Sequence, residues 1–353
     1  MNAAPPSRPV VAVLADARLG GPELGSVADT AVIRYAGDVV ALRTALRDAH
    51  VLFVWDFRTS MLREAWAGAR DLRWIHVAAV GVDTVLFPEL VESDVIVTNS
   101  RGVFDQAIGE YVLGLMLAFE KDLPGTIVRQ HRHAWEHRET GMLGRRTAVV
   151  VGAGGIGRAI GRLAHAVGMR VIGVARTARP LDPDLGTIVP AAELASVLGD
   201  ADYLVIATPL TPETRGLIGA DVFARMKPSA RLINVGRGPI VDEGALLEAV
   251  RAERIAGAAL DVFAREPLPP DHPLWDVPGV IVSPHMSGDF VGSLEALAAL
   301  FRDNFARWRQ GAPLLNVVDK RRGYVPGRAA EEAEPARRAS PRRRDRAGDP
   351  GRS

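Results

Sequence analysis

Short apolar runs alternate with longer amphipathic stretches along most of the chain. Up to residue 100, runs of strand length are followed by turn residues or by a helix-like stretch such as Met61–Gly68. Alternation of this kind predicts an α/β fold with parallel sheets. The strands predicted here are Val10–Leu14, Val51–Trp55, Trp74–Val77 and Val95–Val97.

The pattern changes at Asn99–Gly102, and a second alternation begins at Thr147. Between them, Ala107–Phe119 is too long for a strand and rich in Leu, Met, Ala and Val, which predicts a buried helix. The stretch Gly292–Arg309 is long enough to run back to the first half. In the second alternation we expect strands at Thr147–Val151, Arg170–Val174, Tyr203–Ala207, Arg231–Val235, Ile255–Leu260 and Val280–Val282, a helix from Ile156 to about Val167, and helical or turn segments at Glu213–Gly219 and Leu246–Ala252.

Composition adds limits rather than a function. The 353 residues are 48% hydrophobic and 24% charged, as in an ordinary globular protein with room for two domains. A net charge of +1 gives no reason to expect a nucleic acid or a membrane as partner. The absence of cysteine excludes disulfides and thiolate–metal sites. No apolar run approaches the roughly 20 residues of a membrane span, and the start lacks a secretory signal, so we expect a cytoplasmic protein.

The last residues have a different composition. From about Arg328 the chain consists mainly of Arg, Glu, Ala, Pro, Ser and Gly without apolar periodicity. Such a segment buries too little apolar surface to offset the entropy of ordering, so we expect a disordered charged tail over 326–353. A basic docking tail is the alternative.

A glycine-rich turn follows the predicted strand at Thr147. Gly152, Gly154 and Gly157 form G-x-G-x-x-G between an apolar strand and a helix, the context that the dinucleotide fingerprint requires. The first glycine permits the tight turn, the second lets a pyrophosphate approach the backbone, and the third allows close helix packing. With Gly155 and Ile156, these residues are the predicted phosphate cradle at a helix N-terminus. The alternative is a turn without a ligand.

The end of the next strand bears on the type of cofactor. An NAD site usually places an acidic residue about 20 residues further on, where it binds the ribose 2′-hydroxyl. Here the chain has Ala175, Arg176 and Thr177 instead. An arginine pairs with a 2′-phosphate and a threonine donates a hydrogen bond to it, and Arg179 adds charge nearby. We therefore expect NADP in preference to NAD; a solvated arginine beside an NAD site is the alternative.

Three later segments each place polar residues just after an apolar strand. They read RLINVGRGPIVDEGAL, AALDVFAREPLPPDHPL and VSPHMSG, beginning at residues 231, 258 and 282. In an open α/β sheet, ligands bind in the crevice outside the carboxyl ends of the strands. One arginine (Arg237), one glutamate (Glu266) and one histidine (His285) are thereby predicted to converge on the cofactor side.

Together with these segments, four further motifs occur in a familiar order. They are AAVGVD from residue 78, TNSRG from 98, GEYVLGLML from 109 and TPLTPETRGLIG from 208. From about residue 50 to residue 320, the chain closely resembles the D-isomer-specific 2-hydroxyacid dehydrogenase family. The resemblance implies two doubly wound parallel-sheet domains, Rossmann-like and flavodoxin-like, with the active site in the cleft between them. It implies a substrate-binding domain over 1–100, completed by 289–325, and a dinucleotide-binding domain over 101–288.

The resemblance also implies a role for each polar residue at the strand ends. Arg237 would hold the substrate carboxylate and polarise the keto oxygen. His285 would pass a proton to or from that oxygen, and histidine suits this because imidazole titrates near neutral pH. Glu266 would orient His285. The backbone N–H groups around Val80 and Gly81 would bind the substrate carboxylate.

On the cofactor side, the resemblance implies one polar contact and a lining. Asp261 would hold the nicotinamide carboxamide. The other positions that line the cofactor in the family are Thr208, Pro209, Thr214 and Val235.

The expected activity is hydride transfer between NAD(P)H and a small 2-keto or 2-hydroxy acid, as in a glyoxylate or hydroxypyruvate reductase. The family also implies a homodimer formed through the nucleotide-binding domain. Formate dehydrogenases of this superfamily carry glutamine where Glu266 stands, which argues against formate. A cofactor-sensing corepressor of the same fold is the alternative from another functional class.

Two features leave the chemistry of the site open. The loop Trp55–Thr59 is expected to face the cleft, where Trp55, Phe57 and Arg58 would contact the substrate's substituent, but the substrate's identity is not readable. His131, His133 and His137 lack neighbouring carboxylates, so we expect no metal there.

Overall fold

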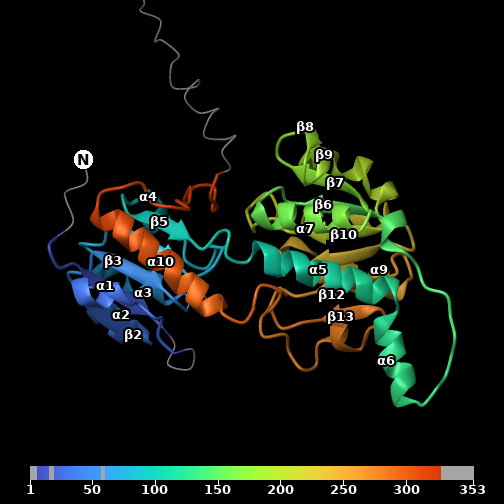
Figure 1. The fold of residues 1–353 in the computed structure, drawn as a ribbon, viewed down its shortest axis with the longest axis horizontal. Coiled ribbons are helices and arrows are strands. Elements are labelled where there is room, and N and C mark those ends of the chain that lie inside the picture. Colours follow the sequence, from blue (N-terminus) through green and yellow to red (C-terminus); the bar gives the residue numbers. More distant parts are fainter. Residues whose placement is uncertain (1–5, 16–19, 57–59, 327–353) are drawn as a thin grey trace, which may run out of the picture.

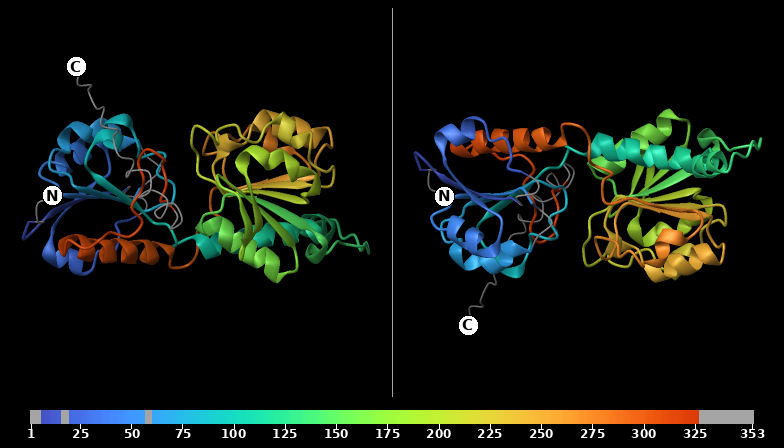
Figure 2. Two further views of the ribbon diagram at one scale, coloured as in Figure 1. Left: turned by 90° about the horizontal axis from the view of Figure 1, so that it is seen from above. Right: turned by 90° about the horizontal axis from the view of Figure 1, so that it is seen from below.

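The computed structural model describes residues 6–15, 20–56 and 60–326, which form two α/β domains (Figure 1). The chain crosses from the first domain to the second before helix α5 and returns before helix α10 (Figure 2). Both domains place helices on the two faces of a central sheet, so the predicted fold class is confirmed.

The first domain is built on a five-stranded parallel sheet in the order β2-β1-β3-β4-β5. Its strands are β1 (Val10–Leu14), β2 (Val32–Ala36), β3 (Val51–Val54), β4 (Trp74–Val77) and β5 (Ile96–Asn99). Its helices are α1 (Ser26–Thr30), α2 (Val39–Ala45), α3 (Met61–Ala65), α4 (Pro88–Glu92) and α10 (Ser293–Arg309).

Helix α10 belongs to this domain although it comes almost two hundred residues after β5. Phe301 stacks on Phe53 of β3 with ring centroids 4.1 Å apart, and on Trp74 of β4 at 5.4 Å. All three rings are fully buried, and they fill the face of the sheet that α10 covers. The predicted return of this helix to the first domain is thus observed.

The second domain carries an eight-stranded sheet in the order β13-β12-β11-β10-β6-β7-β9-β8. All its neighbouring pairs are parallel except β8 with β9. The strands are β6 (Thr147–Val151), β7 (Arg170–Ala175), β8 (Arg179–Asp182), β9 (Gly186–Pro190), β10 (Tyr203–Ile206), β11 (Arg231–Asn234), β12 (Gly257–Leu260) and β13 (Val280–Val282). The helices are α5 (Asp105–Glu120), α6 (Leu123–His131), α7 (Gly155–Ala166), α8 (Ala220–Phe223) and α9 (Glu243–Arg251).

The strand order of this second sheet reverses at β6. The chain proceeds from β6 to β7 on one side, and then crosses over to β10 on the other. The carboxyl ends at such a switch point leave a crevice that neither crossover connection fills, and ligands of open α/β sheets bind there.

Three observed strands lie outside the predictions. Strand β2 is at a sheet edge, where Val32 and Tyr35 are 37% and 55% exposed, so it shows no continuous apolar run. Strands β8 and β9 form an antiparallel hairpin in which only β8 lies at the sheet edge. The segment predicted as helix or turn at 213–219 is a turn, and β12 begins at Gly257 rather than at Ile255.

A projecting arm, residues 122–142, extends from the second domain (Figure 1, lower right). Helix α6 within it has no buried residue, and Trp135 is fully exposed. Asp122 holds the base of the arm, because its carboxylate pairs with Arg129 at 3.1 Å and Arg138 at 2.8 Å. The arm is therefore ordered by polar contacts while its apolar side chains face solvent.

The structure describes only the first residue of the predicted charged tail. Apart from Pro326, the tail predicted over 326–353 lies outside the described residues. Within the described ranges, no helix has the length and apolar character needed to cross a membrane.

Candidate active site

The candidate site lies along the carboxyl ends of the second sheet. The glycine-rich turn follows β6, Arg176 follows β7, and Thr208 follows β10. Arg237, Asp261 and His285 come after β11, β12 and β13. Because parallel strands present their carboxyl ends at one edge, the chain brings these segments together at the side that faces the first domain.

The three fingerprint glycines differ in what surrounds them. Gly152 has φ 120°, and a Cβ there would lie 2.5 Å from the carbonyl oxygen of Ala207. A Cβ on Gly157 would lie 1.8 Å from the carbonyl oxygen of Gly152. Around Gly154 no atom lies within 4 Å of the corresponding position. The first and third glycines are thus required by the protein's own packing, whereas the second leaves open space at the turn.

Helix α7 begins at this turn without a capping side chain. Gly154 is its N-cap, and no side chain accepts a hydrogen bond from the first backbone N–H groups. Free N–H groups at the positive end of a helix dipole suit a pyrophosphate. Gly155 and Ile156 are half-buried in the first turn, where Ile156 packs against the core.

An acidic residue that the sequence did not single out lies beside this turn. A Cβ on Gly155 would lie 2.0 Å from Oδ2 of Asp105, at the start of α5. The Oδ1 atom of Asp105 is buried without a hydrogen-bond partner. Burial raises the pKa of Asp105 although the charges of Arg101 and Arg162 oppose the shift.

The residues predicted to choose the cofactor are exposed at the end of β7. Arg176 and Thr177 are both exposed to solvent. The Arg176 guanidinium carbon lies 5.5 Å from the centroid of the Tyr324 ring. Arg179 lies in β8 and pairs with Asp182 at 3.7 Å. Its charge is therefore already partly neutralised, unlike that of Arg176.

The loop after β10 is held together by one hydroxyl. Thr214 Oγ1 donates a hydrogen bond to the carbonyl oxygen of Pro209 at 2.7 Å and accepts one from the backbone N–H of Thr211 at 2.8 Å. Thr214 thus shapes the loop that carries Thr208 and Pro209. Val235, after β11, is buried with 7% of its surface exposed.

His285 and Glu266 form a close pair. The Nδ1 atom of His285 lies 2.7 Å from Oε2 of Glu266, and the two side chains are 34% and 35% exposed. The other carboxylate oxygen of Glu266 accepts a hydrogen bond from the backbone N–H of Phe263 at 2.9 Å. Burial alone would raise the pKa of Glu266, but hydrogen bonds from His285 and Phe263 and the charges of His285 and Arg237 lower it. The pair therefore presents a carboxylate to Nδ1 and leaves Nε2 for a substrate.

The backbone at His285 is unusual for a side chain of this size. Its φ is 53°, in the left-handed region that non-glycine residues rarely adopt. Met286 and Ser287 follow it, and their backbone N–H groups both donate to the carboxylate of Asp261, each at 2.9 Å. These bonds hold the turn that aims the imidazole.

Asp261 is the residue predicted to hold the nicotinamide carboxamide. Its carboxylate is fully buried and also accepts a hydrogen bond from the hydroxyl of Ser283 at 2.7 Å. Its three donors all come from the segment 283–287, so Asp261 fixes the His285 turn. Its role toward the carboxamide stays a prediction.

Arg237 reaches across to the first domain. Its Nε donates to Oδ1 of Asp83 at 3.1 Å, and its Nη1 donates to the carbonyl oxygen of Gly236 at 2.9 Å. A Cβ on Gly81 would lie 1.7 Å from Nη2, so the guanidinium rests on the backbone at Gly81. The adjacent Val80 is held by Asn99, whose Nδ2 donates to the Val80 carbonyl oxygen at 2.6 Å. The arginine and the predicted carboxylate-binding backbone are thereby side by side.

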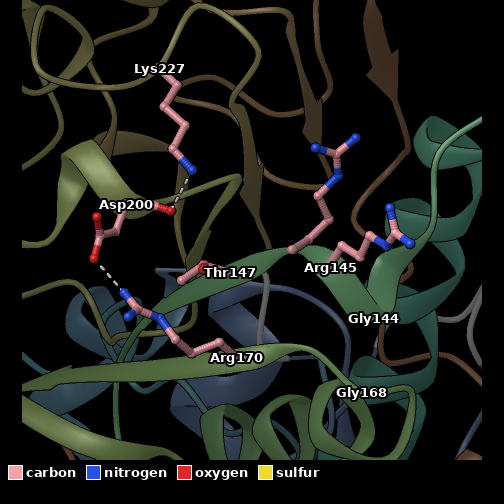
Figure 3. Close-up of a pocket in the computed structure, with 8 residues that line it drawn as sticks. Gly144, Arg145, Thr147, Gly168, Arg170, Asp200 and Lys227 are labelled. Atoms are coloured by element: carbon pink, nitrogen blue, oxygen red, sulfur yellow. Dashed lines mark hydrogen bonds and ion pairs between the residues drawn. The ribbon is translucent and has the colours of Figure 1, made fainter.

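A basic pocket of about 410 Å³ lies at the opposite edge of the same sheet (Figure 3). It is lined at the amino ends of the strands by residues that include Arg145, Arg146, Arg170 and Lys227. Arg170 pairs there with Asp200 (Figure 3). This edge carries none of the residues predicted for catalysis or cofactor binding.

The remaining candidates lie elsewhere. His131 ends α6 and His133 and His137 follow it in the exposed arm, and the described residues contain no group of side chains that could hold a metal ion. Trp55 was expected to face the cleft, but it is only 5% exposed and packs edge-on against Phe53. Phe57 and Arg58 lie outside the described residues.

The chain is similar in sequence to known dehydrogenases and reductases. The family model for the NAD-binding domain of D-isomer-specific 2-hydroxyacid dehydrogenases matches residues 113–287. A glyoxylate/hydroxypyruvate reductase B from Pectobacterium carotovorum is 35% identical over 257 residues, which are 71% of this chain and 80% of that protein. The chain belongs to the D-isomer-specific 2-hydroxyacid dehydrogenase family. The predicted family is confirmed, and so is the predicted class of reaction, NAD(P)-dependent oxidoreduction of 2-hydroxy acids.

Other members of the family are similar to different extents. A D-3-phosphoglycerate dehydrogenase from Methanocaldococcus jannaschii is 32% identical over 280 residues, 78% of this chain, but the chain spans only 52% of that protein's length. Among solved structures, an NADPH-dependent glyoxylate/hydroxypyruvate reductase from Sinorhizobium meliloti, in complex with NADP and sulfate, has a TM-score of 0.76 and 28% identity. The match covers 90% of this chain and 100% of the reductase chain. A second such reductase from the same organism, with NADP and malonate, has a TM-score of 0.77 and 27% identity over 91% of this chain and 100% of its own.

Three residues of this dehydrogenase site were missed by reasoning from sequence. Asp83 closes the AAVGVD motif, so its position beside the predicted carboxylate site was a usable signal. Asp105 and Tyr324 carried no such signal, because each meets its partner only through the fold: Asp105 against Gly155, and Tyr324 against Arg176.

Proposed function

We propose that this protein is an NADPH-dependent reductase of small 2-keto acids, of the glyoxylate and hydroxypyruvate type. The observation that carries the proposal is the 2.7 Å pair of His285 and Glu266 at the same edge as the uncapped helix and the guanidinium of Arg237. We assign substrate binding to 1–100 with 289–325, and dinucleotide binding to 101–288.

His285 is the acid–base of the proposed reaction. A bound reduced nicotinamide supplies hydride to the carbonyl carbon of the keto acid. The imidazolium of His285 donates its Nε2 proton to the carbonyl oxygen, and takes it back when the hydroxy acid is oxidised. Glu266 holds Nδ1–H at 2.7 Å, which fixes the ring's orientation.

Arg237 and the backbone at Val80 and Gly81 bind the substrate's carboxylate. A guanidinium matches a planar carboxylate in shape and charge, and its position against Gly81 places it within the first domain's carboxylate-binding turn. The same positive charge polarises the keto oxygen, which gains electron density as hydride arrives.

The cofactor positions follow from the crevice. Gly152, Gly154, Gly155, Ile156 and Gly157 would hold the pyrophosphate through the turn and the start of α7. The positions that would line the remainder of the cofactor are Thr208, Pro209, Thr214 and Val235.

NADPH is proposed in preference to NADH because of the residues after β7. Arg176 is exposed and Thr177 follows it, and no acidic residue stands at the strand end to bind a ribose 2′-hydroxyl. The similar structures named above from Sinorhizobium meliloti hold NADP, which supports the same choice.

A substrate panel tests the proposal. Oxidation of NADPH and of NADH would be followed with glyoxylate, hydroxypyruvate, pyruvate and 2-ketobutyrate, without any added partner protein. We expect turnover with at least one of the smaller acids and a higher kcat/KM with NADPH. Turnover only with NADH would contradict the cofactor preference. Absence of turnover with every acid, despite binding of NADPH, would favour a cofactor-sensing binding protein.

We further propose that the protein is a cytoplasmic homodimer that uses the arm. A reaction that consumes NADPH needs the pool of reduced cofactor inside the cell, which supports the location. The arm exposes apolar side chains that a second copy would cover: Leu123 (47%), Ile127 (55%), Val128 (47%), Trp135 (100%) and Met142 (61%).

Analytical ultracentrifugation tests the dimer. The wild-type protein should sediment with twice the mass of one chain, and Trp135→Glu together with Ile127→Glu should shift it to the monomer. Val40→Glu is the matched control, because Val40 is 74% exposed on α2 of the first domain. A monomeric wild-type protein at micromolar concentration would refute the proposal.

A further inference from the structure

The chain after α10 forms a tight loop on the first domain. The backbone N–H of Val318 donates to the carbonyl oxygen of Val97 at 2.8 Å, which ties this segment to β5. The loop then closes on Asp319, whose backbone accepts from Gly323 at 2.8 Å and donates to Tyr324 at 3.0 Å. We call residues 316–326 the C-terminal loop. Its backbone is therefore held by the first domain.

One side chain of the C-terminal loop crosses to the second domain. The ring of Tyr324 lies 5.5 Å from the guanidinium carbon of Arg176, at the end of β7. The chain just beyond Tyr324 is pinned by Arg101, whose Nη1 donates to the carbonyl oxygen of Pro326 at 3.3 Å. Tyr324 is thus anchored on both sides while its ring faces the arginine.

Arg176 has no ion-pair partner among the described carboxylates that would take up its donors. The carboxylate whose pKa responds to the charge of Arg176 is that of Glu213. Its pKa is lowered first by a hydrogen bond from Thr211 and only more weakly by the charge of Arg176. Within the described part of the chain the N–H edges of Arg176 make no hydrogen bond, and its guanidinium lies over the ring of Tyr324.

We propose that Tyr324 positions Arg176 for the 2′-phosphate of the cofactor, so that a residue of the substrate-binding domain sets the preference for NADPH. This inference rests on the proposed function, because it requires Arg176 to meet a 2′-phosphate. Tyr324 acts through Arg176 and is a positioning residue.

The chemistry of the contact suits this task. A cation over an aromatic face is attracted by the ring's quadrupole, and the attraction leaves the N–H groups at the guanidinium's edge free. A carboxylate would also orient the arginine, but it would occupy those donors and repel a phosphate. An aromatic ring orients the arginine without either effect.

The test is the ratio of the dissociation constants for NADPH and NADH, measured by quenching of protein fluorescence. Tyr324→Leu removes the ring and should reduce the preference for NADPH by about two- to five-fold, the range expected for a partly exposed cation–π contact. Tyr324→Phe keeps the ring face and should retain the preference. Tyr35→Leu, at an exposed tyrosine on β2, is the matched control.

A double-mutant cycle separates positioning from general stability. In an Arg176→Gln background, Tyr324→Leu should no longer change the ratio, because the ring would have no guanidinium to orient. An unchanged ratio in Tyr324→Leu, with a wild-type preference for NADPH, would overturn the inference alone. So would a ratio that still changes in the Arg176→Gln background. A wild-type preference for NADH would instead refute the proposed cofactor choice and the inference with it. Should Tyr324→Leu fail to fold, Tyr324→Gln would carry the same test.

Discussion

The two edges of the second sheet both carry arginines, yet they use them differently. At the amino edge, Arg146 pairs with Glu120 at 2.8 Å and Lys227 with Asp202 at 3.1 Å. At the carboxyl edge, Arg176 faces an aromatic ring, and the imidazole of His285 is one-third exposed. Arg146 and Lys227 at the first edge are both ion-paired within the protein. At the second edge Arg237 is paired with Asp83, whereas Arg176 makes no ion pair with a described carboxylate and is available to a ligand.

The glycines and helix ends repeat this contrast. Helix α7 begins at the carboxyl edge with uncapped N–H groups and with open space around Gly154. At the amino edge a Cβ on Gly144 would meet the carbonyl oxygen of Val167 at 3.3 Å, so that glycine serves packing between neighbouring loops. A site is therefore indicated by groups that the fold leaves unsatisfied, and the number of basic side chains alone does not indicate one.

The largest expected effect comes from removing the acid–base at the carboxyl edge. His285→Ala should lower kcat by about 10²–10⁴-fold, the contribution of general acid–base catalysis, with little change in the dissociation constant for NADPH. Steady-state kinetics and cofactor titration measure the two. His272→Ala is the control, because His272 sits in a turn where Nδ1 accepts from the backbone of Leu274. Equal losses in the two variants would remove His285 from the reaction.

The next effect concerns the close approach of Arg237 to the first domain. Gly81→Ala would place a methyl group 1.7 Å from Nη2, so the guanidinium must move. Misplacement of a binding group by about 1 Å can reduce the rate by about 10²-fold, and we expect a loss of this order in kcat/KM for the keto acid. Gly114→Ala on α5 has no atom within 4 Å of the added carbon and is the control. Full activity in Gly81→Ala would show that Arg237 does not need this position.

At the amino edge the effect should fall on stability and leave catalysis unchanged. The side chain of Glu120 is only 2% exposed, so Arg146→Ala leaves a buried carboxylate without its guanidinium. We expect a loss of about 1–3 kcal/mol in the free energy of unfolding, measured with urea. Arg170→Ala breaks an exposed pair with Asp200 and should cost about 1 kcal/mol or less. A large fall in kcat/KM in either variant would contradict the division between the edges.

The last effect concerns a buried histidine that the fold leaves without a hydrogen-bond partner at one nitrogen. His76 on β4 is fully buried, Nε2 has no partner, and burial lowers the pKa of His76 to about 3. Because this nitrogen is enclosed by the protein, a ligand does not reach it, and its lack of a partner affects the stability of the fold. Below pH about 6.5 the unfolded chain binds a proton at His76 that the folded chain does not bind. The free energy of unfolding should therefore decrease as the pH is lowered, by up to about 1.4 kcal/mol per pH unit.

Urea unfolding between about pH 7 and pH 5 measures this dependence, and carboxylates that titrate lower contribute less in this window. His76→Gln removes the titrating group and should flatten the profile. Identical slopes for the two proteins would show that His76 is protonated in the folded state or does not titrate in this range.

The sequence predicted the central strands of both sheets because these strands are buried on both faces and read as apolar runs. It did not predict the edge strands β2 and β8, where solvent allows polar side chains such as Arg34 and Arg179. The boundaries of β6 and β13 were correct, since turn residues flank both runs. Apolar runs flanked by turn residues were therefore readable even at the sheet edges β5 and β13, whereas the interior strand β9 was missed.

The candidate site was readable to a similar extent. His285 and Glu266 follow strands in recognisable motifs, and the fold brings them to 2.7 Å. The contacts of Asp83 and Tyr324 depend on how the two domains approach one another, which no local pattern encodes. The resemblance implied a cofactor contact for Asp261, and the structure adds that its buried carboxylate holds the turn of His285.

A single-turnover experiment tests whether His285 transfers a proton during reduction of a 2-keto acid by NADPH. A stoichiometric complex of the protein with NADPH would be mixed rapidly with glyoxylate, hydroxypyruvate or another small 2-keto acid, and absorbance of the reduced nicotinamide would be followed. We expect complete oxidation of NADPH by the wild-type protein, with formation of an equal amount of hydroxy acid. In His285→Ala, with NADPH still bound, the rate should be lower by about 10²–10⁴-fold. NADPH that remains bound and reduced with every acid, or equal rates in the two proteins, would contradict this proton transfer.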